Sequence, residues 1–141
     1  MTDLNHDQKD EIVIILTTGT GSGVHIQELH ILSKEDLSEL TFENPLAYVN
    51  KHIESNVEIS GEEVKVQVKW DQESIEKLYN KADAGAWFDA ASFGQIIEYE
   101  LVGNQLTAIL PGNVSPGEFA ISATLHYDTD LKIDTLTVSE N

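Results

Sequence analysis

The sequence predicts a single α+β domain that is dominated by antiparallel β-sheet. Short apolar runs rich in β-branched residues recur along the 141-residue chain, and segments rich in turn-forming residues separate most of them. About 40% of the residues are hydrophobic, which is enough for a packed core. Because no linker or internal repeat interrupts this pattern, we assign residues 1–141 to one β-rich domain.

The first two elements are expected to form a β-hairpin. Residues 11–16 (EIVIIL) are a nearly continuous apolar run, which is typical of a buried strand. Residues 24–32 (VHIQELHIL) supply the second strand, and the Gly-rich residues 17–23 are interpreted as the turn. Residues 33–40 are expected to form a short helical turn or a loop.

The middle of the chain predicts two short helices and a second hairpin. One helix opens at Asn44-Pro45 and runs to about residue 54, because Pro is favoured in the first helical turn. Residues 57–59 and 64–70 flank a turn, and the second of these runs alternates clearly between apolar and polar residues. A second helix carrying Ile75, Leu78 and Tyr79 is expected next. Residues 81–94 are interpreted as an irregular connection.

The last third of the chain predicts four strands. Residues 95–102 and 105–110 surround the tight-turn dipeptide Gly103-Asn104, and residues 111–117 are expected to form a loop. Residues 119–127 and 131–138 follow, and the alternation slips near residues 134–136, which indicates a bulge or an edge strand.

The elements sum to about eight strands in hairpins with two short helices. A twisted sheet or incomplete barrel that carries the helices on one face or end is the preferred arrangement. A plain β-sandwich is the alternative. A closed propeller is excluded, because too few strands are present for four blades.

The charge of the chain excludes several classes of ligand. There are 25 acidic residues against 8 basic ones, a net charge of −17, and every basic residue is Lys. Phosphate contacts dominate nucleic-acid affinity, so DNA and RNA binding is excluded.

The composition excludes further classes of site. There is no Cys, which excludes disulfides and thiolate zinc sites, and no apolar run reaches the ~20 residues of a membrane span. The acidity serves solubility or, alternatively, recognition of cations or basic proteins.

The N-terminal residues carry the most specific chemical pattern. Asp3, Asn5 and Asp7 place side-chain oxygens at every second position. Such spacing lets them converge on one hard cation, with the Lys9 carbonyl and the Glu11 carboxylate completing the ligand set. Ca²⁺ suits this loop better than Mg²⁺, because it accepts six to eight oxygens in flexible geometry. The alternative is a solvated acidic leader that binds no ion.

This stretch, DLNHDQKDEIVIIL, resembles the Asp-rich calcium loops of FG-GAP and VCBS-type repeats, which read D-x-[DN]-x-D-G-x-x-[DE] before an apolar strand. Residues 3–32 are similar to VCBS-like secreted or lipid-anchored proteins of Gram-positive bacteria. Gln8 stands where the family has its turn Gly, and His6 replaces another frequent Gly. The resemblance implies a β-rich fold, a binding or structural role, and a secreted or cell-surface location in bacteria. We therefore expect a domain without its signal peptide.

Three further features of the sequence favour a structural role. Residues 17–23 contain G-x-G-x-G, but a strand follows and no Lys, so a hairpin turn is favoured over a phosphate cradle. Glu28 and His30 share one strand face, yet the sequence shows no third metal ligand beside them. Trp87 and Phe88 are interpreted as plugs of the core rather than as a sugar-stacking or partner-anchoring pair.

These observations predict a non-enzymatic extracytoplasmic or surface domain with a binding or structural role. Calcium is its candidate cofactor, and a protein or carbohydrate is its candidate ligand. No hydrolase motif such as G-x-S-x-G or H-E-x-x-H occurs. Two alternatives stay open: a small hydrolase with an acidic cleft, and an acidic inhibitor of a basic protein partner.

Overall fold

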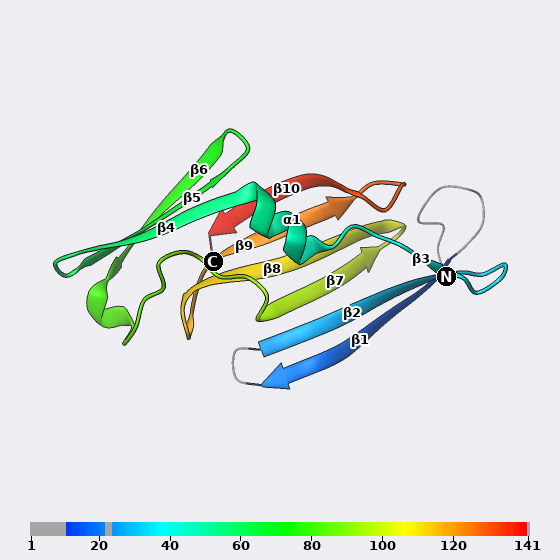
Figure 1. The fold of residues 1–141 in the computed structure, drawn as a ribbon, viewed down its shortest axis with the longest axis horizontal. Coiled ribbons are helices and arrows are strands. Elements are labelled where there is room, and N and C mark those ends of the chain that lie inside the picture. Colours follow the sequence, from blue (N-terminus) through cyan, green and yellow to red (C-terminus); the bar gives the residue numbers. More distant parts are fainter. Residues whose placement is uncertain (1–10, 22–23, 141) are drawn as a thin grey trace.

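The computed structural model describes residues 11–21 and 24–140, and within them ten strands form two sheets (Figure 1). The larger sheet has the order β1-β2-β7-β8-β9-β10, with β3 pairing alongside β2. Its strands are β1 (Glu11–Gly21), β2 (Val24–Ser33), β3 (Glu39–Leu40), β7 (Ile96–Val102), β8 (Gln105–Ser115), β9 (Glu118–Tyr127) and β10 (Ile133–Glu140). The smaller sheet, of order β4-β5-β6, consists of β4 (Ile53–Ser60), β5 (Glu63–Trp70) and β6 (Glu73–Asn80).

The prediction of a β-rich fold with mainly antiparallel pairing is confirmed. The helical content of the described residues is smaller than expected: one α-helix, α1 (Pro45–His52), and one 3₁₀ turn, η1 (Lys81–Asp83). Asn44 caps α1, because its side-chain oxygen accepts a hydrogen bond from the Ala47 N–H at 3.1 Å. Among the described residues, no helix has the length and apolarity needed to cross a membrane.

The predicted second helix is wrong, because its residues form the strand β6. Asp71 adopts a left-handed conformation with φ of 51°, which allows a tight turn after β5. Ile75 then pairs with Val68, and Tyr79 pairs with Val64. Residues four apart share a face in a strand as well as in a helix, so Ile75 and Tyr79 fit both patterns. Leu78, which suggested the helix, is 57% exposed.

Parts of the predicted Gly-rich turn and of the predicted loop at residues 111–117 are strands. The Gly-rich residues 17–21 belong to β1, and residues 111–115 belong to β8. Both segments contain shifts of register, between Thr17 and Gly19 and around Asn113. Such bulges accommodate Gly and Pro within a sheet, which is why these residues did not end the strands. The predicted irregularity near residues 134–136 is confirmed by a register shift in β10, the opposite edge of the larger sheet.

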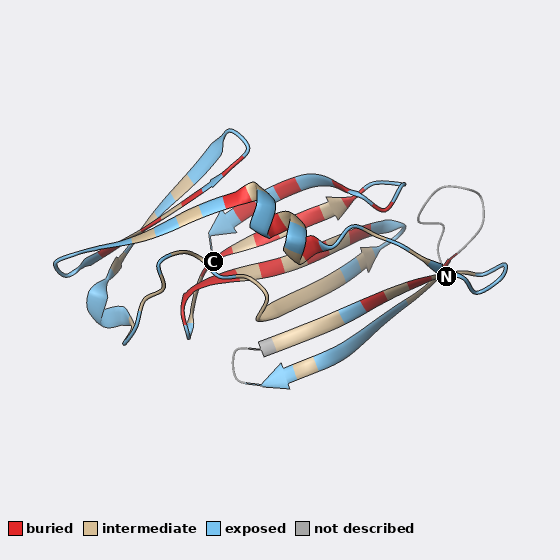
Figure 2. Ribbon diagram, viewed as in Figure 1, coloured by how far each residue is buried: buried red, intermediate tan, exposed pale blue. Residues whose placement is uncertain are grey.

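The buried residues of the larger sheet lie mainly on its central strands β8 and β9 and on β10 (Figure 2). Ala108 and Leu110 of β8 and Ala123 and Leu125 of β9 are completely buried. Val49 of α1, which crosses this sheet in Figure 1, belongs to the same continuous apolar cluster. Val66, Val68 and Trp70 of β5 in the smaller sheet also belong to it, so both sheets share one core.

The connection between η1 and β7 lies against the smaller sheet. The Val57 N–H donates to the Asp89 carbonyl at 2.8 Å, and the Ala91 N–H donates to Ser55 Oγ at 2.8 Å. Trp87 is half-buried against the core, and its indole N–H donates to the Lys81 carbonyl at 3.1 Å. This supports the interpretation of Trp87 as a core residue.

A short parallel contact joins β2 to β7. Its register contains only His25↔Ile96 and Ile26↔Ile97. The His25 N–H donates to the Gln95 carbonyl at 2.9 Å. Beyond this contact, the Gln27 side-chain oxygen accepts a hydrogen bond from the Tyr99 N–H at 2.8 Å. The Gln27 amide thus takes the role that a main-chain carbonyl has in a continuous ladder.

Residues 41–44, between β3 and α1, contact strands at the other end of the larger sheet. The Phe42 ring packs edge-on against Tyr99 and Tyr127, with ring centroids 6.1 and 6.2 Å apart. The Glu43 carboxylate accepts a hydrogen bond from the Ile133 N–H at 2.8 Å, and the Glu43 carbonyl accepts one from the Tyr127 hydroxyl at 2.8 Å. These contacts fix β3, and with it one side of β2, to β9 and β10.

Matched Leu→Ala substitutions test the placement of β6 and the core. Leu125→Ala should lower the free energy of unfolding by about 2–5 kcal/mol, because Leu125 is completely buried. Leu78→Ala should change it by less than about 0.5 kcal/mol, because Leu78 lies on the exposed face of β6. Urea unfolding monitored by tryptophan fluorescence measures both. A large loss for Leu78→Ala would contradict the strand placement.

Candidate functional site

The edge strand β1 is the most unusual surface of the molecule. Among the described residues it pairs with β2 alone, so its other side is an open sheet edge. From Ile12 to Gly21 the strand carries no charged side chain, although the chain has a net charge of −17. Folded proteins commonly protect such edges with charges, Pro or a covering segment.

Both faces of β1 expose apolar side chains. Ile14 and Leu16 are 37% and 47% exposed, and they lie opposite His30 and Glu28 on β2. Ile15 is 36% exposed on the other face, opposite Leu29. The sequence predicted a buried strand here, and that prediction is wrong for residues 14–16. A continuous apolar run indicates contacts on both faces, but it does not reveal that the strand lies at an edge.

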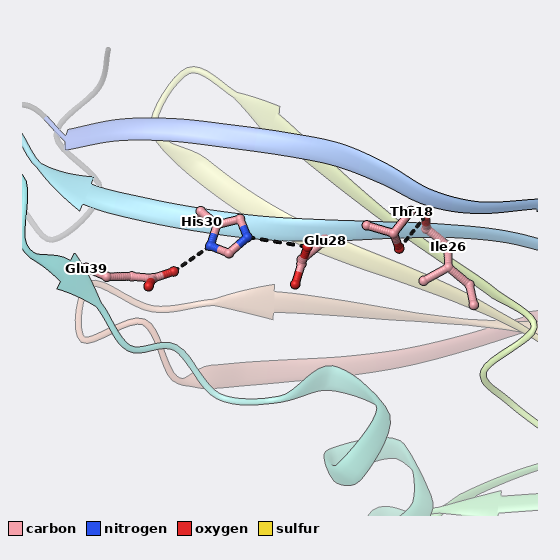
Figure 3. Close-up of polar contacts among 5 residues, drawn as sticks. All are labelled: Thr18, Ile26, Glu28, His30 and Glu39. Atoms are coloured by element: carbon pink, nitrogen blue, oxygen red, sulfur yellow. Dashed lines mark hydrogen bonds and ion pairs between the residues drawn. The ribbon is translucent and has the colours of Figure 1, made fainter.

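The bulge in β1 lets the strand continue beyond its apolar part. The register with β2 shifts between Thr17 and Gly19, and the Thr18 hydroxyl donates to the Ile26 carbonyl at 3.4 Å (Figure 3). Pairing resumes as Gly19↔Ile26 and ends at Gly21↔Val24. The result is an edge of eleven residues that stays extended.

Beside this edge, His30 lies between two carboxylates (Figure 3). Its Nδ1 is 2.5 Å from Glu39 Oε1, and its Nε2 is 3.5 Å from Glu28 Oε2. Glu28 and His30 come from β2, and Glu39 comes from β3, where it pairs with Leu32. We call these three residues the His30 triad. The expectation that Glu28 and His30 share a face agrees with the contact between their side chains.

The His30 triad favours a protonated imidazole. The hydrogen bond with Glu39 is the largest cause that raises the pKa of His30, and the hydrogen bond with Glu28 is the next. Both ring nitrogens donate only when the ring is a cation, so each carboxylate stabilises that form. With His30 protonated, the triad has a net charge of −1.

The triad does not have the geometry of a metal site. Its two ring nitrogens face different carboxylates, so the three side chains do not converge on one point. No cluster of three or more His, Asp or Glu side chains suited to a metal ion occurs within residues 11–21 and 24–140. The part of Glu39 in the triad could not be predicted from the sequence, because a two-residue strand has no periodicity.

Of the five predicted calcium ligands, only Glu11 belongs to the described residues. Asp3, Asn5, Asp7 and Lys9 lie outside the described residues. Glu11 begins β1 opposite Ser33, and it is only 2% exposed. A Ca²⁺ site formed by these five residues stays a prediction.

An open hollow of about 350 Å³ at the β9–β10 turn is lined by two Asp side chains, so it is one candidate for the acidic cleft of a hydrolase. Asp128 Oδ1 accepts hydrogen bonds from the N–H groups of Asp130 at 2.9 Å and Lys132 at 3.0 Å. This carboxylate therefore stabilises the turn. Asp134 is the second carboxylate of the lining.

Comparison with known proteins does not add to this geometry. No family model matches the chain, and searches of curated proteins and of solved structures found no match. The resemblance of residues 3–32 to VCBS-like proteins thus stays a prediction. The function must be argued from the described residues.

The pKa of His30 tests the triad directly. An NMR titration of the His30 ring should give a pKa above the ordinary histidine value of about 6.5. Glu39→Gln should lower this pKa more than Glu28→Gln does, because the bond with Glu39 is the larger cause. Glu76→Gln in the smaller sheet is the control and should leave it unchanged.

The same shift makes a small contribution to stability that depends on pH. Since folding raises the pKa of His30, the contribution is fully present below about pH 6.5 and is lost as the pH rises through the folded pKa.

In the NMR titration, an equal His30 pKa in the wild type and in Glu39→Gln would show that the two side chains do not interact in solution.

Proposed function

We propose that the protein is a non-enzymatic binding domain that recognises another protein by adding one of its strands to β1. Strand addition combines main-chain hydrogen bonds along an open edge with contacts to alternate side chains. The observation that carries this proposal is the uncharged edge of β1, with Ile14, Ile15 and Leu16 exposed on its two faces.

The pairing between β1 and β2 supports a preformed docking strand. It runs from Glu11↔Ser33 to Gly21↔Val24, so β1 is held extended along its whole length. A partner therefore meets an edge that is already ordered and loses little conformational entropy in ordering it. The opposite edge strand, β10, is less suitable, because it carries the charged residues Asp134 and Glu140.

In this proposal the domain acts outside the cytoplasm, as the resemblance of residues 3–32 implies. Calcium bound by Asp3, Asn5, Asp7, the Lys9 carbonyl and Glu11 would fix the segment that leads into β1. The burial of Glu11 at the start of β1 supports a link between that segment and the docking strand. A melting temperature that is the same in calcium and in a chelator would contradict the calcium site.

Two other functions are less well supported. A hydrolase would need two carboxylates free for catalysis, and in the hollow at the β9–β10 turn Asp128 Oδ1 already accepts two main-chain hydrogen bonds. A carbohydrate site built on Trp87 would need a free indole face and N–H. That N–H is already bonded to the Lys81 carbonyl, and the ring packs against the core and lies 5.6 Å from Tyr79.

A capped peptide of alternating Thr and Val, which favours the extended conformation, tests strand addition. In NMR titrations it should shift the amide signals of β1 and β2 and leave those of β10 unchanged. Leu16→Lys should abolish the shifts, because a charge then lies on the docking edge. Val102→Lys is the matched control, since Val102 is 74% exposed at the end of β7.

Two results would count against edge recognition. One is a set of shifts that survives Leu16→Lys, and the other is a set centred on β10. Equal melting temperatures of the two Lys variants would show that the loss of binding does not arise from unfolding.

A further inference from the structure

We propose that the strand which docks on β1 is basic, with Lys or Arg side chains alternating with apolar ones, and that Glu28 recognises one of its cationic groups. This inference rests on the proposed function and adds the chemistry of the partner. It is carried by the distribution of charge around β1 and by the register between β1 and β2.

Carboxylates outnumber Lys in the strands next to the edge. Strands β1, β2, β3 and β7 contain no Lys, whereas they carry five carboxylates. These are Glu11, Glu28, Glu39, Glu98 and Glu100. Among them, the side chains of Glu28 and Glu39 are 54% and 57% exposed, so they are available to a ligand.

The smaller sheet shows a different arrangement of charge. There, Glu54 pairs with Lys69 and Glu58 pairs with Lys65 across neighbouring strands. Lys65 Nζ also lies 3.6 Å from Glu76 Oε2. Acidic residues in the smaller sheet are thus partly neutralised by Lys within the fold, whereas Glu28 and Glu39 contact His30.

The register places the Glu28 carboxylate within reach of a docked strand. Leu16 lies directly opposite Glu28, and Ile14 lies opposite His30. A strand added to β1 would lie about 10 Å from β2, which is two strand spacings. A Lys or Arg side chain on that strand can extend over Leu16 towards Glu28 while its aliphatic stem packs on the exposed Leu16 and Ile14. An apolar neighbour on the opposite face would contact Ile15.

A second copy of this chain fits the edge less well. Antiparallel pairing of β1 with itself would match apolar residues with apolar residues. It would also bring together two chains of net charge −17, each with Glu28 and Glu39 beside the edge. Like charges across an interface oppose association, and salt weakens this repulsion. Self-association that grows with salt is therefore the signature of the competing occupant.

Three capped peptides of equal length test the inference, with Val alternating with Lys, with Thr or with Glu. Fluorescence anisotropy should give the highest affinity for the Val-Lys peptide and the lowest for the Val-Glu peptide. Added salt should weaken the binding of the Val-Lys peptide. Glu28→Gln should weaken it about two- to fivefold, the range of an exposed ion pair. Glu140→Gln on the opposite edge strand, which makes the same change of charge, should have no effect.

The outcomes separate the inference from the proposed function. Equal affinity for the three peptides, lost in Leu16→Lys, would overturn the basic partner and leave edge recognition standing. Binding of none of the peptides would overturn both. Sedimentation gives the third outcome. If the fraction of dimer in the wild type increases with salt, and Leu16→Lys forms no dimer, a second copy of the chain is the occupant and the basic partner is overturned.

Discussion

The short parallel contact between β2 and β7 is the feature on which the rest of the molecule depends. Within the described sheet it joins β1, β2 and β3 to the strands that carry the core, with only two residue pairs in register. The Gln27 side chain extends the contact by accepting the Tyr99 N–H. Phe42 reinforces it from the β3 side by packing on Tyr99 and Tyr127. This attachment orients β1 as an open edge away from the core.

If β1 is the docking strand, stability and recognition lie in different parts of one sheet. The completely buried residues of the larger sheet concentrate in β8 and β9, and β1 contributes few contacts to that core. Changes in the exposed residues of β1 should therefore affect binding more than folding. The charge is divided in a similar way, since Lys side chains partly neutralise the smaller sheet and carboxylates predominate beside the edge.

Sequence patterns predicted the local structure better than the assembly. The alternation in residues 64–70 and the slip near residues 134–136 are local signals, and both predictions are confirmed. The β6 region was mistaken for a helix, because Ile75 and Tyr79 satisfy both periodicities and only pairing with β5 decides between them. The edge position of β1 and the approach of Glu39 to His30 depend on strand order, which periodicity does not contain. The predicted Asp-rich loop remains a prediction, because four of its five ligands lie outside the described residues.

Amide hydrogen exchange along β1 in the free protein tests the central claim most directly. An open edge held by β2 on one side predicts alternation, with amides that face β2 exchanging slowly and the intervening amides exchanging as fast as those of exposed loops. In β9, which has a neighbour on both sides, successive amides should all exchange slowly. Uniform protection along β1 would show that its outer edge is already covered in the free protein, which would contradict the assignment of β1 as an open docking strand.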